Sequence, residues 1–132
     1  MSELMFRGYN ANRMMIDEGV DIVATKDNVY YYIQVKTVAL RDGKIYCQIP
    51  RYRFDQYVSN QIRYIIVART NDGNMYFTLT PRDIEMGLSG GYIKASEDTI
   101  HVKIKFHPIS GEPYLYDNRE QNANYFANNF KL

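Results

Sequence analysis

The sequence of 132 residues contains one cysteine, Cys47, and no tryptophan. A single cysteine excludes an internal disulfide framework and a zinc site built from several cysteines, and it fits a reducing, intracellular setting. No apolar run approaches the roughly 18 residues that a membrane-spanning helix needs, and the N-terminus lacks the apolar core of a signal peptide. These absences predict a cytoplasmic protein with no membrane partner.

Neither sign of charge dominates, because 16 basic residues face 15 acidic ones. The charges are nevertheless grouped: residues 35–70 carry seven basic and two acidic side chains, whereas residues 17–27 carry four acidic side chains and one basic. An acidic pocket beside a basic field is what a metal-dependent enzyme acting on a polyanion needs. A mixed-charge, solvated surface explains the same pattern equally well.

The remaining composition is that of a globular protein, with 45% hydrophobic and 23% charged residues. The length predicts a single domain over residues 1–132 with one core. Thirteen tyrosines suit a β-rich protein with amphipathic rings near its surface.

A predicted hairpin organises the chain. The β-rich runs Val20–Thr25 and Val29–Val38 flank the polar break Lys26-Asp27-Asn28. A two-residue loop sets Asp21 opposite Gln34, whereas a three-residue loop sets Asp21 opposite the preceding residue, Ile33. In both registers Asp21 lies within one residue of Gln34, where cross-strand neighbours are about 5 Å apart.

Alternation along the second run places Gln34 and Lys36 on one face of the strand. With Asp21 opposite or diagonal to Gln34, that face holds a carboxylate, an amide and an ammonium group. These three groups form the candidate site.

Further elements follow from periodicity and turn residues. Helices are expected over Ser2–Arg7, over Tyr52–Asn60, from the Thr80-Pro81 cap to about Leu88, and in the Asn-rich tail from Asp117 to Phe130. Further strands are expected over Asn12–Ile16, Lys44–Ile49, Arg63–Arg69, Met75–Leu79, Tyr92–Ala95 and Thr99–Phe106. The turn at residues 41–44 predicts that Lys44–Ile49 pairs back on the preceding strand. The class is α/β, with one mixed central sheet flanked by short helices.

The central stretch resembles the PD-(D/E)XK nuclease superfamily, to which restriction endonucleases, archaeal Holliday junction resolvases and Mrr-type enzymes belong. The resemblance rests on Asp21, twelve intervening residues and then Gln34-Val35-Lys36. The phrases Gly19–Ala24 and Ile33–Thr37 resemble the branch in which Gln replaces the second acid. The resemblance covers about residues 8–79 and implies a restriction endonuclease-like fold.

The resemblance also implies a magnesium-dependent endonuclease that cuts DNA by attack of a magnesium-bound water. Asp21, the side-chain oxygen of Gln34 and the backbone carbonyl of Val35 would coordinate magnesium, with manganese as a substitute. Lys36 would hold or activate the attacking water and balance charge on the phosphodiester. Asp21, Gln34 and Lys36 are thus the expected catalytic residues.

Two positions depart from the superfamily pattern. Val20 stands where the superfamily name has Pro. Such folds also place a Glu on the first helix, where this chain offers only Glu3, close to the predicted helix end. Either Glu3 is a metal ligand, or the usual Glu lies upstream and the first helix is truncated.

The expected partners are duplex or branched DNA and a second copy of the chain, because related nucleases often pair to cut two strands. The basic and aromatic residues after the site are the expected phosphate contacts: Arg41, Lys44, Arg51, Tyr52 and Arg53. A DNA-binding or assembly module of the same fold, with weak or lost catalysis, is the alternative. A regulatory partner protein with a Tyr-rich surface is a third interpretation.

Overall fold

The computed structural model describes residues 10–13, 22–56 and 61–128, without the side chains of residues 10–13, Arg53 and Gln56. Its strands are β1 (Asn10–Arg13), β2 (Ile22–Lys26), β3 (Val29–Ala39), β4 (Lys44–Pro50), β5 (Ile62–Thr70), β6 (Gly73–Leu79), β7 (Lys94–Ala95), β8 (Thr99–Phe106), β9 (Pro113–Tyr116) and β10 (Glu120–Asn122). Its helices are α2 (Arg51–Gln56) and α3 (Pro81–Gly90).

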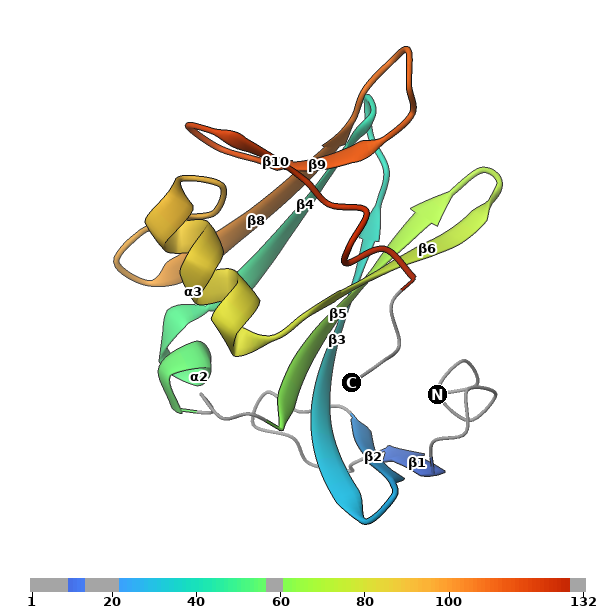
Figure 1. Ribbon diagram of the computed structural model, residues 1–132, viewed down its shortest axis with the longest axis vertical. Helices are drawn as coiled ribbons and strands as arrows, with labels where there is room; N and C mark the ends of the chain where they lie inside the picture. Colours follow the sequence, from blue (N-terminus) through green and yellow to red (C-terminus); the bar gives the residue numbers. More distant parts are fainter. Residues whose placement is uncertain (1–9, 14–21, 57–60, 129–132) are drawn as a thin grey trace.

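The described strands form two sheets (Figure 1). Sheet A has the order β1-β2-β3-β5-β6 and is mixed, because β3 and β5 are parallel while its other pairs are antiparallel. Sheet B has the order β10-β9-β8-β4, with the two-residue β7 also paired to β8, and is antiparallel throughout. The main core contains buried residues from both sheets.

The expected hairpin of the central stretch is confirmed as β2 and β3, and the two-residue alternative is the correct one. Lys26 pairs with Val29, which leaves Asp27 and Asn28 as the loop. Both loop residues have positive φ, 53° and 65°. Asn and Asp tolerate this region better than most residues, and two-residue loops of this kind match the twist of the strands they join.

Sheet A has apolar residues on both faces, as expected of a sheet covered on both sides. One face carries Ile22, Ala24, Ile33 and Ile65, which form a small cluster of their own. The other face carries Tyr64, Ile66, Ala68 and Phe77 and packs into the main core against sheet B.

The third expected helix is confirmed as α3. Thr80 accepts a hydrogen bond from the Asp83 amide at 3.0 Å, and the Asp83 carboxylate accepts one from the Thr80 amide at 2.9 Å. This reciprocal pair, followed by Pro81 at the first helical position, fixes the start. Gly91 ends the helix in the left-handed conformation, with φ of 82°. The helix contacts β5, β6 and β7.

The expectation of one central sheet is wrong, and so is the expected pairing of the strand after the 41–44 turn. The turn itself forms, with Arg41 and Lys44 bridged across Asp42 and Gly43. Beyond it, β4 departs from β3 and pairs with β8 over its whole length. The paired residues are 49 to 61 positions apart in the sequence, and no local turn signal encodes such a pairing.

The expected C-terminal helix is also wrong. The segment contains β10, then turns, and then a bridge that pairs Ala127 with Phe77 on β6. Ion pairs hold the short β10 hairpin against β8, between Lys105 and Glu120 and between Lys103 and Asp117. The hydrogen bonds from these lysines are the main cause of the lowered pKa of each carboxyl. Docking to two sheets outweighs the weak helical spacing of the tail's aromatic residues.

Other expected elements are confirmed in part. β5, β6 and β8 lie where they were expected, whereas β7 is shorter than predicted and α2 is described only to Gln56. The expected helix over residues 2–7 lies outside the described residues, as does part of the expected first strand. Within the described part of the chain, neither helix is long and apolar enough to cross a membrane.

Candidate functional site

Gln34 and Lys36 lie on the face of β3 that is turned toward sheet B. Their parallel neighbours on β5 are Tyr64 and Ile66, and both belong to the main core. The side chain of Gln34 is 4% exposed, and that of Lys36 is partly buried. The two polar residues thus share a face with core residues, which is an unusual position for an amide and an ammonium group.

The two carboxylates of the expected site, Asp21 and Glu3, lie outside the described residues. The ladder between β2 and β3 is described up to Ile22, which pairs with Ile33. Residue 21 directly precedes Ile22 in the chain, and Gln34 directly follows Ile33. The described register is therefore the one with a two-residue loop, which predicts that Asp21 lies opposite Gln34.

Cys47 of β4 approaches the candidate site from sheet B. It is buried, and burial raises the pKa of its thiol to about 11, against a smaller opposing effect of the Lys36 ammonium. Lys36 pairs with Ile66 of the main core, so it lies on the face of β3 that is turned toward sheet B. Cys47 is packed in the main core.

Tyr64 forms the wall beside Gln34. Its side chain is 2% exposed, and its ring lies 6.1 Å from the ring of Phe54 on α2. Burial is the larger cause of its raised pKa of about 12, and the negative charge of Asp55 on α2 adds to it. The tyrosine therefore stays protonated at neutral pH and can act as a hydrogen-bond donor beside the amide.

The described residues contain no group of three His, Cys, Asp or Glu side chains that could hold a metal. The donors that β3 offers are the amide oxygen of Gln34 and the backbone carbonyl of Val35. Oxygen donors of this type suit magnesium, but two neutral oxygens need carboxylates beside them to bind it firmly. The donor set fits a magnesium site only when completed by acids such as Asp21 and Glu3.

The expected DNA contacts fall into two groups at opposite ends of β4. Arg41 and Lys44 lie at the turn that precedes the strand, and both are exposed. Arg51 and Tyr52 begin α2 directly after the strand, and both are also exposed. The length of β4 separates the groups by about 20 Å, at 3.3 Å per residue. The structure does not bring them together at one point. The side chain of Arg53 lies outside the described part.

Arg51 is tied to its surroundings. Its Nη1 donates to the backbone oxygen of Ser96 at 3.3 Å, and its Nε lies 4.0 Å from Oδ2 of Asp55. The guanidinium is almost half exposed. Exposed pairs of this kind contribute little to stability.

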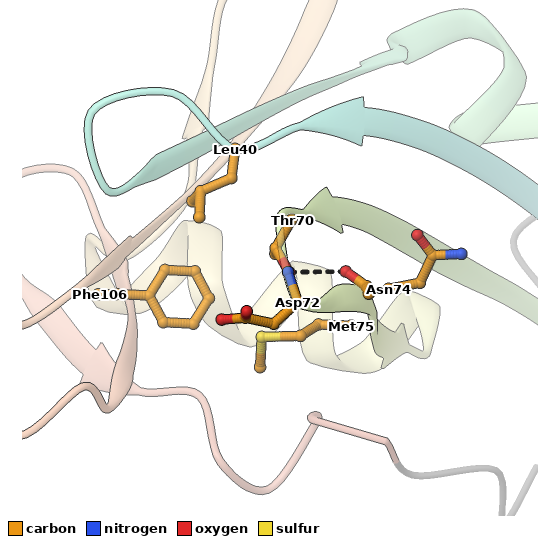
Figure 2. Close-up of a pocket in the computed structure, with 7 residues that line it drawn as sticks. Leu40, Thr70, Asp72, Asn74, Met75 and Phe106 are labelled. Carbon is orange, nitrogen blue, oxygen red and sulfur yellow. Dashed lines mark hydrogen bonds between the residues drawn. The ribbon is translucent and has the colours of Figure 1, made fainter.

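A pocket of about 280 Å³ lies at another place, beside the β5–β6 turn. The side chains of Leu40, Phe106 and Met75 and the Asp72 carboxylate line this pocket, whereas the Asn74 amide points away from it (Figure 2). Its lining residues are Leu40, Thr70, Asp72, Gly73, Asn74, Met75 and Phe106. None of the expected catalytic or DNA-binding residues lines it.

Sequence reasoning missed that sheet B covers the Gln34 and Lys36 face, and therefore missed Tyr64 and Cys47 as neighbours of the site. A signal was present. Residues 44–49 and 99–106 both alternate strictly between polar and apolar, which is typical of strands with one buried face. Two such strands need a second apolar surface to cover, and the buried face of β3 and β5 supplies it.

Comparison of the sequence with known protein families found no match, and comparison with curated proteins found none. Among solved structures, the fold is similar to that of Hjc, a Holliday junction resolvase from the archaeal hyperthermophile Archaeoglobus fulgidus. The TM-score is 0.50 at 15% sequence identity, over 76% of this chain and 74% of that chain. The expected restriction endonuclease-like α/β fold is thus confirmed.

Proposed function

We propose that this chain is a magnesium-dependent endonuclease that hydrolyses phosphodiester bonds of duplex or branched DNA, with manganese as a substitute ion. One observation carries the proposal: in a restriction endonuclease-like fold, the described β2–β3 register ends one residue before the pair Asp21 and Gln34. If the ladder continues by one residue, the carboxylate and the amide project from the same face, next to Lys36.

In this proposal Asp21, Gln34, the Val35 carbonyl and Glu3 hold the magnesium ion. When bound, magnesium supplies a Lewis acid that lowers the pKa of water and neutralises phosphate charge. Tyr64 and the core around it fix the orientation of Gln34, because a side chain that is 4% exposed has few alternative rotamers. The preorganised amide offsets part of the affinity lost by replacing a carboxylate with a neutral ligand.

Lys36 has two roles in the proposed mechanism. Its ammonium orients the attacking water toward the phosphorus, and it stabilises the negative charge that grows on the phosphate oxygens. Cys47 leaves this charge uncompensated, because burial keeps the thiol neutral. The lysine is partly buried, where electrostatic interactions are stronger than in water.

The remaining proposed parts are the DNA contacts and the assembly. Arg41 and Lys44 at one end of β4, and Arg51, Tyr52 and Arg53 at the other, would contact phosphates about 20 Å apart. This spacing suits an extended duplex better than a single phosphate. We also propose that the protein works as a homodimer, so that two copies cut two strands.

The test is cleavage of supercoiled plasmid and of a synthetic four-way junction with magnesium, manganese or EDTA. Asp21→Ala and Lys36→Ala are each expected to reduce the rate at least about 100-fold, because each removes a group that acts on the reacting phosphate. Lys94→Ala, an exposed lysine on β7, is the matched control and should cut at the wild-type rate.

Cleavage that survives EDTA, or that both variants retain, would contradict the proposal. The preferred substrate separates a junction-specific enzyme from a general endonuclease. DNA binding without cleavage identifies the second candidate, a binding or assembly module of the same fold. The burial of the neutral Gln34 favours this alternative, because the amide is poorly open to a hydrated ion.

A further inference from the structure

Strand β4 forms one edge of sheet B. It pairs with β8 on one side. Within the described ranges, the only pairing on its other side is the bridge between Arg41 and Lys44 at the turn. An edge strand presents backbone groups that can pair with another chain.

The hydrogen bonds at the two ends of β4 show which residues face outward. Phe106 donates to the Gly43 carbonyl at 2.9 Å, and Arg51 donates to the Asp98 carbonyl at 2.9 Å. Both bonds follow the β4–β8 register. Because bonded and non-bonded pairs alternate in an antiparallel ladder, the odd-numbered residues of β4 bond to β8. The backbone groups of Tyr46 and Gln48 therefore point to the outer edge.

The ends of β4 limit this edge to four groups. At one end, Lys44 exchanges both of its backbone hydrogen bonds with Arg41, at 2.9 Å each. At the other end, Pro50 has no N–H to donate. The groups left are the N–H and C=O of Tyr46 and of Gln48, and no hydrogen bond of the described residues uses them.

The side chains beside these groups are accessible. Tyr46 is 45% exposed, and Gln48 and Lys44 are also exposed. The Gln48 amide donates to the Tyr46 hydroxyl at 2.8 Å, so the two side chains are held together on the outer face. The opposite face of the strand, with Ile45, Cys47 and Ile49, is buried in the main core.

We propose that a second copy of this chain pairs with β4 through its own β4, antiparallel, about a two-fold axis at Cys47. Tyr46 then lies opposite Gln48 of the partner subunit, and Lys44 lies opposite Pro50 of the partner subunit. The strand is self-complementary in this register. Pro50, which has no N–H, lies opposite Lys44, whose backbone groups are already bonded to Arg41. Four hydrogen bonds join the two sheets B into one closed, isologous dimer.

This inference locates the contact of the homodimer proposed above. It depends on neither magnesium nor cleavage, so each can fail without the other. A monomer that cuts DNA would overturn the β4 contact and leave the nuclease in place. A dimer that does not cleave DNA would overturn the nuclease proposal and leave the β4 contact in place.

The first test is Gln48→Pro, with Gln48→Ala as its matched control. Proline removes the Gln48 N–H in both copies, and therefore two of the four hydrogen bonds, at an edge position where proline is tolerated. Sedimentation equilibrium should show a dissociation constant raised about ten-fold or more for Gln48→Pro and nearly unchanged for Gln48→Ala. Circular dichroism checks that the variant is folded.

Cross-linking tests the register even if the proline variant does not fold. In a Cys47→Ala background, chains with Tyr46→Cys and chains with Gln48→Cys are mixed and oxidised. Directly opposed residues are about 5.5 Å apart between Cα atoms, within reach of a disulfide, whereas diagonal ones at about 7–8 Å are not. Only the mixture should cross-link. A monomer at all concentrations, or equal cross-linking of each variant alone, would overturn the proposal.

Discussion

The hydroxyl of Thr78 is buried on sheet A and has no hydrogen-bond partner among the residues that the structure describes. Its residue is 7% exposed and pairs with Ile65, so the hydroxyl faces the small apolar cluster of that sheet. A buried polar group that makes no hydrogen bond loses its hydration without compensation. The threonine therefore lowers the free energy of unfolding relative to an apolar side chain of similar shape.

Thr78→Val is therefore expected to raise the free energy of unfolding by about 1 kcal/mol, because it replaces the unpaired hydroxyl with a methyl group of similar size. Urea denaturation measures the change. Thr37→Val, at an exposed position on β3, is the control and should change stability by less than about 0.5 kcal/mol. A loss of stability in Thr78→Val would show that the hydroxyl has a partner after all.

At the scale of single elements, close packing at α3 sets a limit on its sequence. Gly87 lies inside the helix, where alanine is favoured by about 1 kcal/mol. A Cβ atom at this position would lie 2.5 Å from Cδ1 of Ile93, which is 2% exposed. The glycine is thus required by the approach of the β7 segment, not by its backbone conformation.

Gly87→Ala is expected to lower the free energy of unfolding by about 1–2 kcal/mol, since the cost of overpacking exceeds the gain in helix propensity. Thermal and urea unfolding measure it. Ser89→Ala, on the exposed side of the same helix, should be neutral or slightly stabilising. If Gly87→Ala also stabilised the protein, Ile93 would have to move without loss of packing.

The sequence predicts elements here better than it predicts their partners. The hairpin of β2 and β3, the cap at Thr80 and the strand β8 follow from signals within a few residues, and all are confirmed. The pairing of β4 with β8 and the course of the tail depend on contacts between distant segments. Local turn chemistry and periodicity carry no information about such contacts.

The candidate site shows the same division. Spacing and alternation place Gln34 and Lys36 on one face of β3, as the structure confirms. That the face is buried under sheet B, beside Tyr64 and Cys47, could not be read from the hairpin alone. The roles assigned to Asp21 and Glu3 remain predictions.

At the scale of the whole molecule, the main core joins the two sheets. Ile49 of β4 and Val102 of β8 pack in one cluster with Tyr64 and Phe77 of sheet A. A C-terminal strap, residues 123–128, adds backbone bonds to both sheets: Ala123 donates to the Pro113 carbonyl at 2.9 Å, and Thr78 donates to the Phe126 carbonyl at 3.0 Å. A shared core supports the prediction of a single domain.

A single domain should unfold in one cooperative transition, observed identically by tyrosine fluorescence and circular dichroism. Phe126→Ala should lower the free energy of unfolding by about 3–5 kcal/mol in that one transition, because Phe126 is 7% exposed and packs in the shared core. Tyr125→Ala, whose side chain is 74% exposed, is the matched control. Two separate transitions would show that the chain unfolds as two units and would contradict the single domain.

The strap also affects how the protein is made on the ribosome. β6 is synthesised long before Ala127, its partner across the bridge. Until residues 123–128 have left the ribosome, the outer edge of β6 has no strap and can pair with other nascent chains. The backbone of Tyr76 donates to and accepts from Asn128 at this edge, so the edge is protected only after residue 128 has been synthesised. Slow synthesis of residues 80–128 should therefore favour aggregation, whereas refolding of the 132-residue chain from denaturant has the strap available from the start.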